Sequence, residues 1–184
     1  MKAHEYQAKQ LMAESSYPKG FDVVLCIGTG VGLGADWQSI GLQEQSDLAK
    51  IGIKVTLNKM VGSQLMPLYR AQKTDLFLGG WGPDYNDPHT NAQPFADYTA
   101  KQIAYRNAYE NEQTAKMIQE AGVEMDDAKR IALYQAANKI IQDDGPFVFL
   151  YQPLYLHAVR NDNQGFLPGS TFALTKLYPV SRKK

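Results

Sequence analysis

Residues 21–55 read FDVVLCIGTGVGLGADWQSIGLQEQSDLAKIGIKV, and this stretch decides the fold. Residues 21–27 are almost all apolar, which indicates a buried strand. A helix is expected from about residue 36 to residue 50, because apolar residues recur there every three or four positions. Ile53, Val55 and Leu57 then alternate with polar residues as a second strand. Two strands joined by one helix form a right-handed crossover and run parallel.

The alternation of strands and helices extends beyond this stretch. Residues 63–72 suit a helix and residues 75–78 a third strand, so we predict a mainly parallel sheet with helices on both faces, in three layers. Ile131, Tyr134 and Ile141 are expected on the inner face of a later helix. The further predicted elements are helices at 3–15, 112–121 and 126–142 and strands at 147–151 and 154–160. The chain is therefore predicted to be an α/β protein.

Composition argues against several classes of protein. The 184 residues are 44% hydrophobic and 21% charged, and 19 basic side chains balance 19 acidic ones. This balance favours neither a nucleic acid nor an anionic membrane as partner. Cys26 is the single cysteine, so an internal disulfide is impossible, and its apolar neighbours predict a buried, inert thiol. No run approaches the ~20 apolar residues that cross a bilayer. Residues 1–14 do not resemble a secretory signal, so the chain as written is expected to stay where it is made.

A glycine-rich segment, Gly30-x-Gly32-x-x-Ala35, follows the first strand and opens a helix. This pattern is the loose fingerprint of dinucleotide binding, and it leaves a Rossmann-like nucleotide-binding enzyme domain as an alternative. The fingerprint also needs an acid near the end of the second strand, and residues 54–59 contain none. A flexible loop that lines a crevice at the sheet edge is the preferred interpretation.

Residues 79–88 read GGWGPDYNDP and follow directly on the third strand. Their glycines and prolines stop the strand and stiffen a turn. The turn carries Trp81, Asp84 and Asp87 at the carboxyl end of a parallel strand, where open α/β sheets bind ligands. An aromatic wall beside an acid suits a cationic group of an organic ligand. The residue types alone slightly favour an ordinary polar loop with a half-buried tryptophan.

Metal binding and catalysis receive little support from the residues. Asp84, Asp87 and His89 lie close in sequence, but their spacing does not match a calcium loop. Asp87 is interpreted as a turn-forming side chain and His89 as an exposed one. No nucleophile motif accompanies the three histidines. We therefore expect no enzyme, no metal and no cofactor.

Four segments, in a fixed order, match a known pattern. They are residues 17–21 (YPKGF), residues 47–55 (DLAKIGIKV), residues 80–88 (GWGPDYNDP), and residues 127–134 together with 146–153. Each is loose by itself, but the ordered set is specific and spans about residues 5–166. In this order they resemble the extracytoplasmic solute-binding proteins of peptide-type ABC importers, the dipeptide and oligopeptide class known as family 5.

The resemblance implies a domain organisation and a function. Members of the family have two lobes that close over a ligand, and residues 1–165 resemble the carboxyl-terminal lobe alone. Residues 166–184 would return to the first lobe. By this resemblance the chain captures peptides and delivers them to a membrane permease, and the intact protein is periplasmic. The isolated lobe is expected to self-associate through the apolar surface that faced the first lobe.

The resemblance also assigns ligand-binding roles to Gly80, Trp81, Asp84 and Tyr85. Asp84 matches the aspartate that receives the amino terminus of a peptide, Trp81 matches an aromatic wall of the pocket, and the backbone of Gly80 lies beside it. An ammonium group donates charge-assisted hydrogen bonds to a carboxylate. Relatives of this kind also carry nickel chelates, haem, sugars or opines, so a non-peptide ligand stays open as an alternative.

Overall fold

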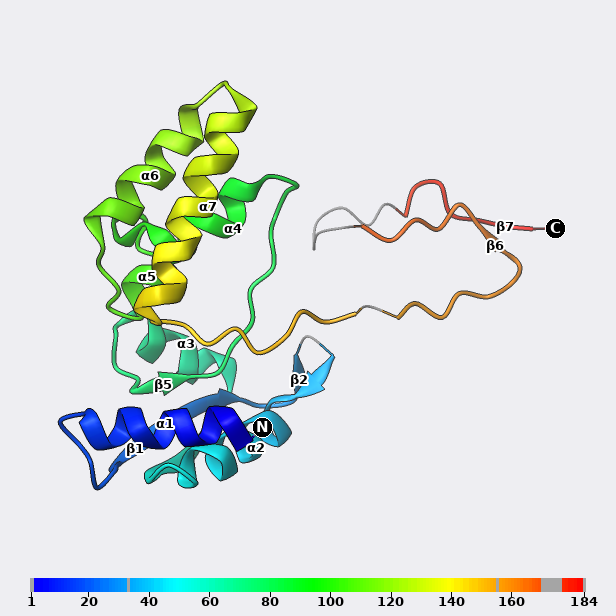
Figure 1. Cartoon of the computed structure of the whole chain (residues 1–184). Helices are drawn as coiled ribbons and strands as arrows, with labels where there is room; N and C mark the ends of the chain where they lie inside the picture. The colour runs from blue at the N-terminus through cyan, green and yellow to red at the C-terminus, as the bar shows by residue number, and fades with distance from the viewer. Residues whose placement is uncertain (1, 33, 155, 170–176, 184) are drawn as a thin grey trace. The chain divides into compact units, whose positions relative to one another are not determined.

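The computed structural model describes residues 2–32, 34–154, 156–169 and 177–183 (Figure 1). The chain forms two compact units, Met1–Gly80 and Trp81–Lys184. A parallel sheet forms the centre of the first unit, and a pair of long helices forms the centre of the second. Each unit has its own hydrophobic core.

The sheet of the first unit contains β1 (Phe21–Gly28), β4 (Ile53–Met60) and β5 (Leu76–Phe77), in the order β4-β1-β5. All its pairings are parallel, and β1 pairs with β4 along all eight residues of each strand. Beyond the short β5, the amide of Leu78 donates to the carbonyl of Cys26 at 3.0 Å. The predicted strands at 21–27, 53–57 and 75–78 and their parallel direction are confirmed.

Two helices, α2 (Trp37–Ala49) and α3 (Gly62–Arg70), cover opposite faces of this sheet. On one face, Ile27 of β1 is 1% exposed and belongs to a core against which Trp37 and other α2 residues pack. Successive side chains of a strand point to opposite faces. On the other face, Phe77 of β5 stacks on Tyr69 of α3 with ring centroids 3.8 Å apart. Helix, sheet and helix therefore form the predicted three-layer α/β arrangement.

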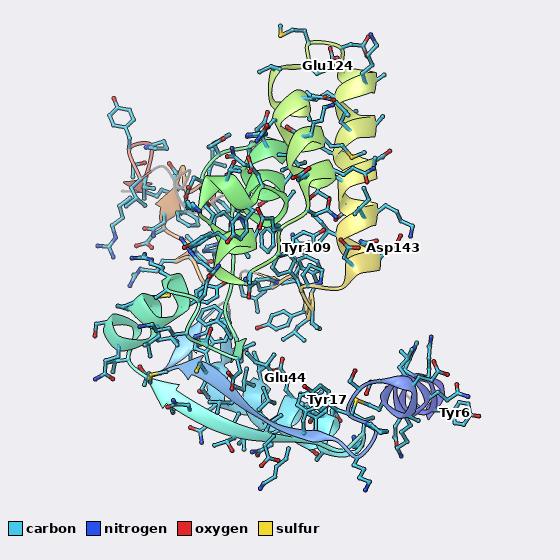
Figure 2. All side chains as sticks on the ribbon, turned by 90° about the vertical axis from the view of Figure 1, so that its left-hand side faces the viewer. Tyr6, Tyr17, Glu44, Tyr109, Glu124 and Asp143 are labelled. Atoms are coloured by element: carbon cyan, nitrogen blue, oxygen red, sulfur yellow. The ribbon has the colours of Figure 1, made fainter. Side chains whose placement is uncertain are left out.

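The remaining helix of the first unit, α1 (Lys2–Glu14), confirms the helix predicted at 3–15. None of the side chains of residues 4–14 is buried, and Figure 2 shows Tyr6 projecting from α1. Tyr6 is 66% exposed and Leu11 is 60% exposed. Tyr6 and Leu11 of α1 are thus largely uncovered by the rest of the described chain.

The second unit is helical. It begins with α4 (Pro88–Ala96), a 3-10 turn at Tyr98–Ala100 and α5 (Ile103–Arg106). The longer helices α6 (Glu112–Val123) and α7 (Asp127–Asp144) lie side by side as a hairpin, with Glu124 at its turn (Figures 1 and 2). Their core is built on small and branched residues, namely Ala96, Ile118, Ala137 and Ile141. The helices predicted at 112–121 and 126–142 are confirmed, whereas α4 was not predicted.

The segment after α7 corrects the sequence prediction. Residues 147–151 and the described part of 154–160 form no strand, although their apolar runs predicted two. Val148 is 83% exposed, Leu154 90% and Leu156 94%. An apolar run becomes a strand only when another strand satisfies its backbone groups, and the described residues provide no such partner here. The segment therefore leaves α7 as an extended, largely exposed chain.

Two short strands complete the second unit. β6 (Asn163–Gln164) and β7 (Ser181–Arg182) pair in antiparallel fashion. Asp162, next to β6, accepts hydrogen bonds from Nε of Arg160 at 3.0 Å and Nε of Arg182 at 2.8 Å. Asp162 thereby links Arg182 of β7 to the segment that leads into β6.

Candidate ligand-binding site

The predicted ligand loop connects the two units of the structure. Gly80 is the last residue of the first unit, whereas Trp81, Asp84 and Tyr85 belong to the second. Asp84 and Tyr85 are exposed, and Trp81 is half-buried. Within the second unit the loop thus presents one carboxylate and one phenol to solvent, three and four residues after a partly covered indole.

An aromatic cluster supports Trp81. Its ring meets Phe95 of α4 edge-on, with centroids 5.8 Å apart. Phe95 in turn contacts Phe147 at 5.2 Å and Phe149 at 5.9 Å, both from the segment after α7. Trp81 Nε1 is buried and has no hydrogen-bond partner among the described residues. A buried N–H without an acceptor is unfavourable, so this group has an unused capacity to donate.

Asp87 fixes the end of the loop by capping α4. Its carboxylate accepts a hydrogen bond from the backbone N–H of His89 at 2.8 Å, and Pro88 occupies the first turn of the helix. Aspartate at this position satisfies an N–H group that the helix leaves unpaired, and proline there removes no needed donor. The interpretation of Asp87 as a turn-forming residue agrees with this cap.

Asp87 also forms an ion pair with the helical hairpin. Nη2 of Arg130, in α7, donates to Oδ1 of Asp87 at 2.7 Å, and the two side chains are 24% and 32% exposed. The hydrogen bond from Arg130, followed by that from the His89 amide, lowers the pKa of Asp87 below its ordinary value. Asp87 is therefore ionised over the whole neutral range, and its carboxylate is engaged on the protein side of the loop.

The expectation that His89 is simply exposed is wrong. Its ring is partly buried, and Nδ1 lies 3.2 Å from the hydroxyl of Tyr134. A Cβ atom placed on Gly122 would lie 3.0 Å from the ring, so α6 passes close to His89 at this glycine. This contact could not be predicted from the sequence, because Tyr134 lies 45 residues away along the chain.

A shallow pocket lies between part of the loop and α7. It has a volume of about 490 Å³ and lies between Pro83, Tyr85 and Asn86 of the loop and Tyr134 and Asn138 of α7. Tyr85, a predicted ligand residue, therefore stands at the rim of a cavity, while Asp84 is not among the lining residues.

The glycine segment after β1 has a structural explanation. It forms a small ribbon, β2 (Val31–Gly32) paired with β3 (Ala35–Asp36). A side chain on Gly32 would lie 2.2 Å from the ring of Trp37, so glycine is needed there to admit that indole.

The start of α2 is not suited to binding a phosphate group. The carboxylate of Asp36 accepts from the amide of Ser39 at 2.9 Å, at the helix terminus that a dinucleotide site offers to a pyrophosphate. The negative charge of Asp36 opposes phosphate binding at this terminus.

The described residues offer few other sites. Cys26 is buried, as predicted, and burial raises the pKa of its thiol. Among the described residues, no three His, Cys, Asp or Glu side chains are grouped closely enough to share a metal ion. None of the helices in the described ranges combines the length and apolar character that a bilayer crossing requires.

Comparison with known proteins identifies relatives with similar amino-acid sequences. The probable D,D-dipeptide-binding periplasmic protein DdpA of Escherichia coli (strain K12) is 32% identical over 133 residues, which are 72% of this chain and 26% of that protein. Di/tripeptide-binding protein 2 of Pseudomonas aeruginosa (strain UCBPP-PA14) is 26% identical over 87% of this chain and 30% of its own length. The chain thus spans about a quarter to a third of these curated relatives.

Solved structures share the fold. The periplasmic binding protein DppA of Helicobacter pylori, in complex with the peptide STSA, has a TM-score of 0.81 at 22% identity, over 97% of this chain and 34% of that one. A dipeptide-binding protein from Pseudoalteromonas sp. SM9913, in complex with Met-Leu, has a TM-score of 0.78 at 24% identity, over 97% of this chain and 35% of that one. Residues 3–103 match the bacterial extracellular solute-binding proteins, family 5, in their middle region, and the chain belongs to that family.

Proposed function

We propose that residues 1–165 are the second, carboxyl-terminal lobe of a receptor that captures peptides and delivers them to an ABC permease in the membrane. Residues 166–184 return to the first lobe of that receptor. The intact protein works outside the cytoplasm, in the periplasm, a location that the names of DdpA from Escherichia coli and DppA from Helicobacter pylori include. Membership of family 5 and the relatives' names support this proposal.

The observation that carries the proposal is the exposed carboxylate of Asp84 on a loop that is held at both ends. Trp81 packs on Phe95 before it, and Asp87 caps α4 after it. A carboxylate in this position suits the ammonium group of a peptide, because charge-assisted hydrogen bonds strengthen when a closing cleft excludes water. Gly80, Trp81 and Tyr85 complete the proposed set.

Trp81 is proposed to donate a hydrogen bond to the ligand in addition to forming an aromatic wall of the pocket. Its buried Nε1–H has no acceptor in the described chain, and a peptide carbonyl or an ordered water is a chemically suitable acceptor. Main-chain hydrogen bonds of this kind do not depend on the ligand's side chains. A receptor that relies on them accepts many peptide sequences.

Exposed apolar residues support a further part of the proposal. In residues 147–156, Val148, Phe149 and Leu154 are among the apolar side chains that the described chain leaves uncovered. The first lobe is proposed to cover this surface in the receptor. In its absence the same surface favours association between copies of the isolated chain.

The relatives named above are binding proteins, and we propose a binding role without catalysis. Calorimetric titration of a two-lobed receptor that contains this chain tests the proposal. A mixture of di- and tripeptides is expected to give saturable heat, and NAD is expected to give none. Saturable NAD binding that Gly32→Val abolishes would replace the peptide receptor with the nucleotide-binding alternative. Binding of neither, with saturable heat from a sugar, haem or nickel chelate, would replace peptides by that ligand.

A further inference from the structure

Four side chains join the ligand loop to the helical hairpin, and we call them the loop anchor: Asp87, His89, Arg130 and Tyr134. Arg130 Nη2 donates to Asp87 Oδ1 at 2.7 Å and to the Tyr134 hydroxyl at 3.2 Å. The same hydroxyl lies 3.2 Å from Nδ1 of His89, whose backbone amide donates to Asp87. The contacts therefore close a ring that begins and ends at Asp87.

The ring is attached to a third element. Nε of Arg130 donates to the carbonyl of Ala121 at 3.0 Å, close to the carboxyl end of α6. Carbonyls in the last turn of a helix lack an intrahelical partner, and a cation is favourable there. The planar guanidinium thus uses separate nitrogens for α6 and for the loop, a geometry that lysine cannot reproduce.

We propose that Arg130 is a positioning residue for ligand binding: through Asp87 it holds the loop so that Asp84 and Tyr85 stand where they receive the ligand. This inference rests on the proposed function. Asp87 lies three residues after Asp84 and two after Tyr85, and its amide donates to the Tyr85 carbonyl at 3.0 Å. The pocket between Tyr85 and Tyr134 leaves the loop without close packing on that side. The anchor attaches the loop to α7 through the ion pair of Arg130 with Asp87 and the contact of Tyr134 with His89.

The chain offers variants that separate positioning from folding. Arg130→Gln removes the charge that reaches Asp87. Asp87→Asn also removes a charge but keeps a side chain that caps helices as well as aspartate does. Arg130→Lys retains the charge without the planar fork. Lys139→Gln is the matched control, because Lys139 is an exposed cation on the same helix and pairs with Asp143 of that helix instead of with a loop residue.

The first readout is hydrogen exchange of the 184-residue chain. With Arg130→Gln, the amides of residues 84–87 are expected to exchange about tenfold faster, because the loop opens more often. The amides of Ile118 and Ala137, in the hairpin core, are expected to keep their protection. Lys139→Gln should change neither set. Unchanged exchange of residues 84–87 in both Arg130→Gln and Asp87→Asn would overturn the proposal.

The second readout is peptide binding by the two-lobed receptor, measured as rates. If only about one tenth of the loops are competent, the apparent affinity and the association rate constant both fall about tenfold. The dissociation rate constant is expected to stay unchanged, and Arg130→Lys is expected to lie between the parent and Arg130→Gln. A loop that opens faster with no loss of affinity would overturn the positioning role and leave the proposed function intact. A parent receptor that binds no peptide would overturn both.

Discussion

Residues 1–184 alone are expected to bind a free-amine dipeptide about a thousandfold more weakly than a two-lobed receptor that contains them. The chain spans about a quarter to a third of its curated relatives. In the proposed receptor, a ligand enclosed between two lobes draws many of its contacts from the other lobe. Loss of about 4 kcal/mol of binding free energy corresponds to a factor of about a thousand. In the proposed receptor, the closed cleft also excludes water and so strengthens the proposed bond to Asp84, and the chain alone lacks this effect.

Calorimetry on both proteins with the same dipeptide measures this ratio. The buffer, temperature and peptide are held constant, and the chain is confirmed to be folded by circular dichroism before titration. Equal dissociation constants for the chain and the receptor would contradict the expectation. They would mean that the loop at 79–88 carries nearly all of the affinity.

Ile27→Ala is expected to lower the free energy of unfolding of the first unit by about 2–5 kcal/mol. Ile27 is 1% exposed and is one of the largest fully buried side chains among the described residues. It lies under α2, where a methyl group added to Gly41 would come within 3.5 Å of it. Truncation leaves a cavity that helix and sheet close only in part.

Urea unfolding with Trp37 as the single tryptophan reports this loss, because Trp37 packs on the same core. Every protein in this comparison carries Trp81→Phe, which leaves Trp37 as the single tryptophan. Leu42→Ala is the control, since Leu42 lies in α2 of the same unit and is 48% exposed, and exposed substitutions usually change stability by no more than about 0.5 kcal/mol. A loss for Ile27→Ala no larger than that for Leu42→Ala would contradict the placement of Ile27 in the core.

The sheet could be predicted from the sequence because its signals are local. Each of these signals can be recognised from a few neighbouring residues. They are the many apolar residues in 21–27, the alternation from Ile53 to Leu57, and the helical periodicity between them. The helix period of α7 was less informative. It predicted Ile131 on the inner face together with Ile141, whereas Ile131 is 54% exposed and Ile141 is 6% exposed. Helical periodicity shows which residues share one face of a helix, but not how much of that face a neighbouring element covers.

The strands predicted at 147–151 and in the described part of 154–160 are wrong for a related reason. Strand formation depends on a second strand, and no sequence window contains that information. The loop anchor likewise could not be predicted from the sequence, since Asp87 and Arg130 lie 43 residues apart. The site residues Gly80, Trp81, Asp84 and Tyr85 came from the family resemblance, and their role in binding stays a prediction.

The measurement that tests the central claim most directly compares one dipeptide and its N-acetylated form on the two-lobed receptor, with and without Asp84→Asn. Asparagine keeps the shape of the side chain but removes its charge. Asp84→Asn is expected to weaken binding of the free-amine dipeptide by about 1–3 kcal/mol, or about 5- to 150-fold. The N-acetylated dipeptide, which has no ammonium group, is expected to bind both proteins weakly and equally. An unchanged affinity for the free-amine dipeptide, or an equal loss for both ligands, would contradict the claim that Asp84 receives the ligand's amino terminus.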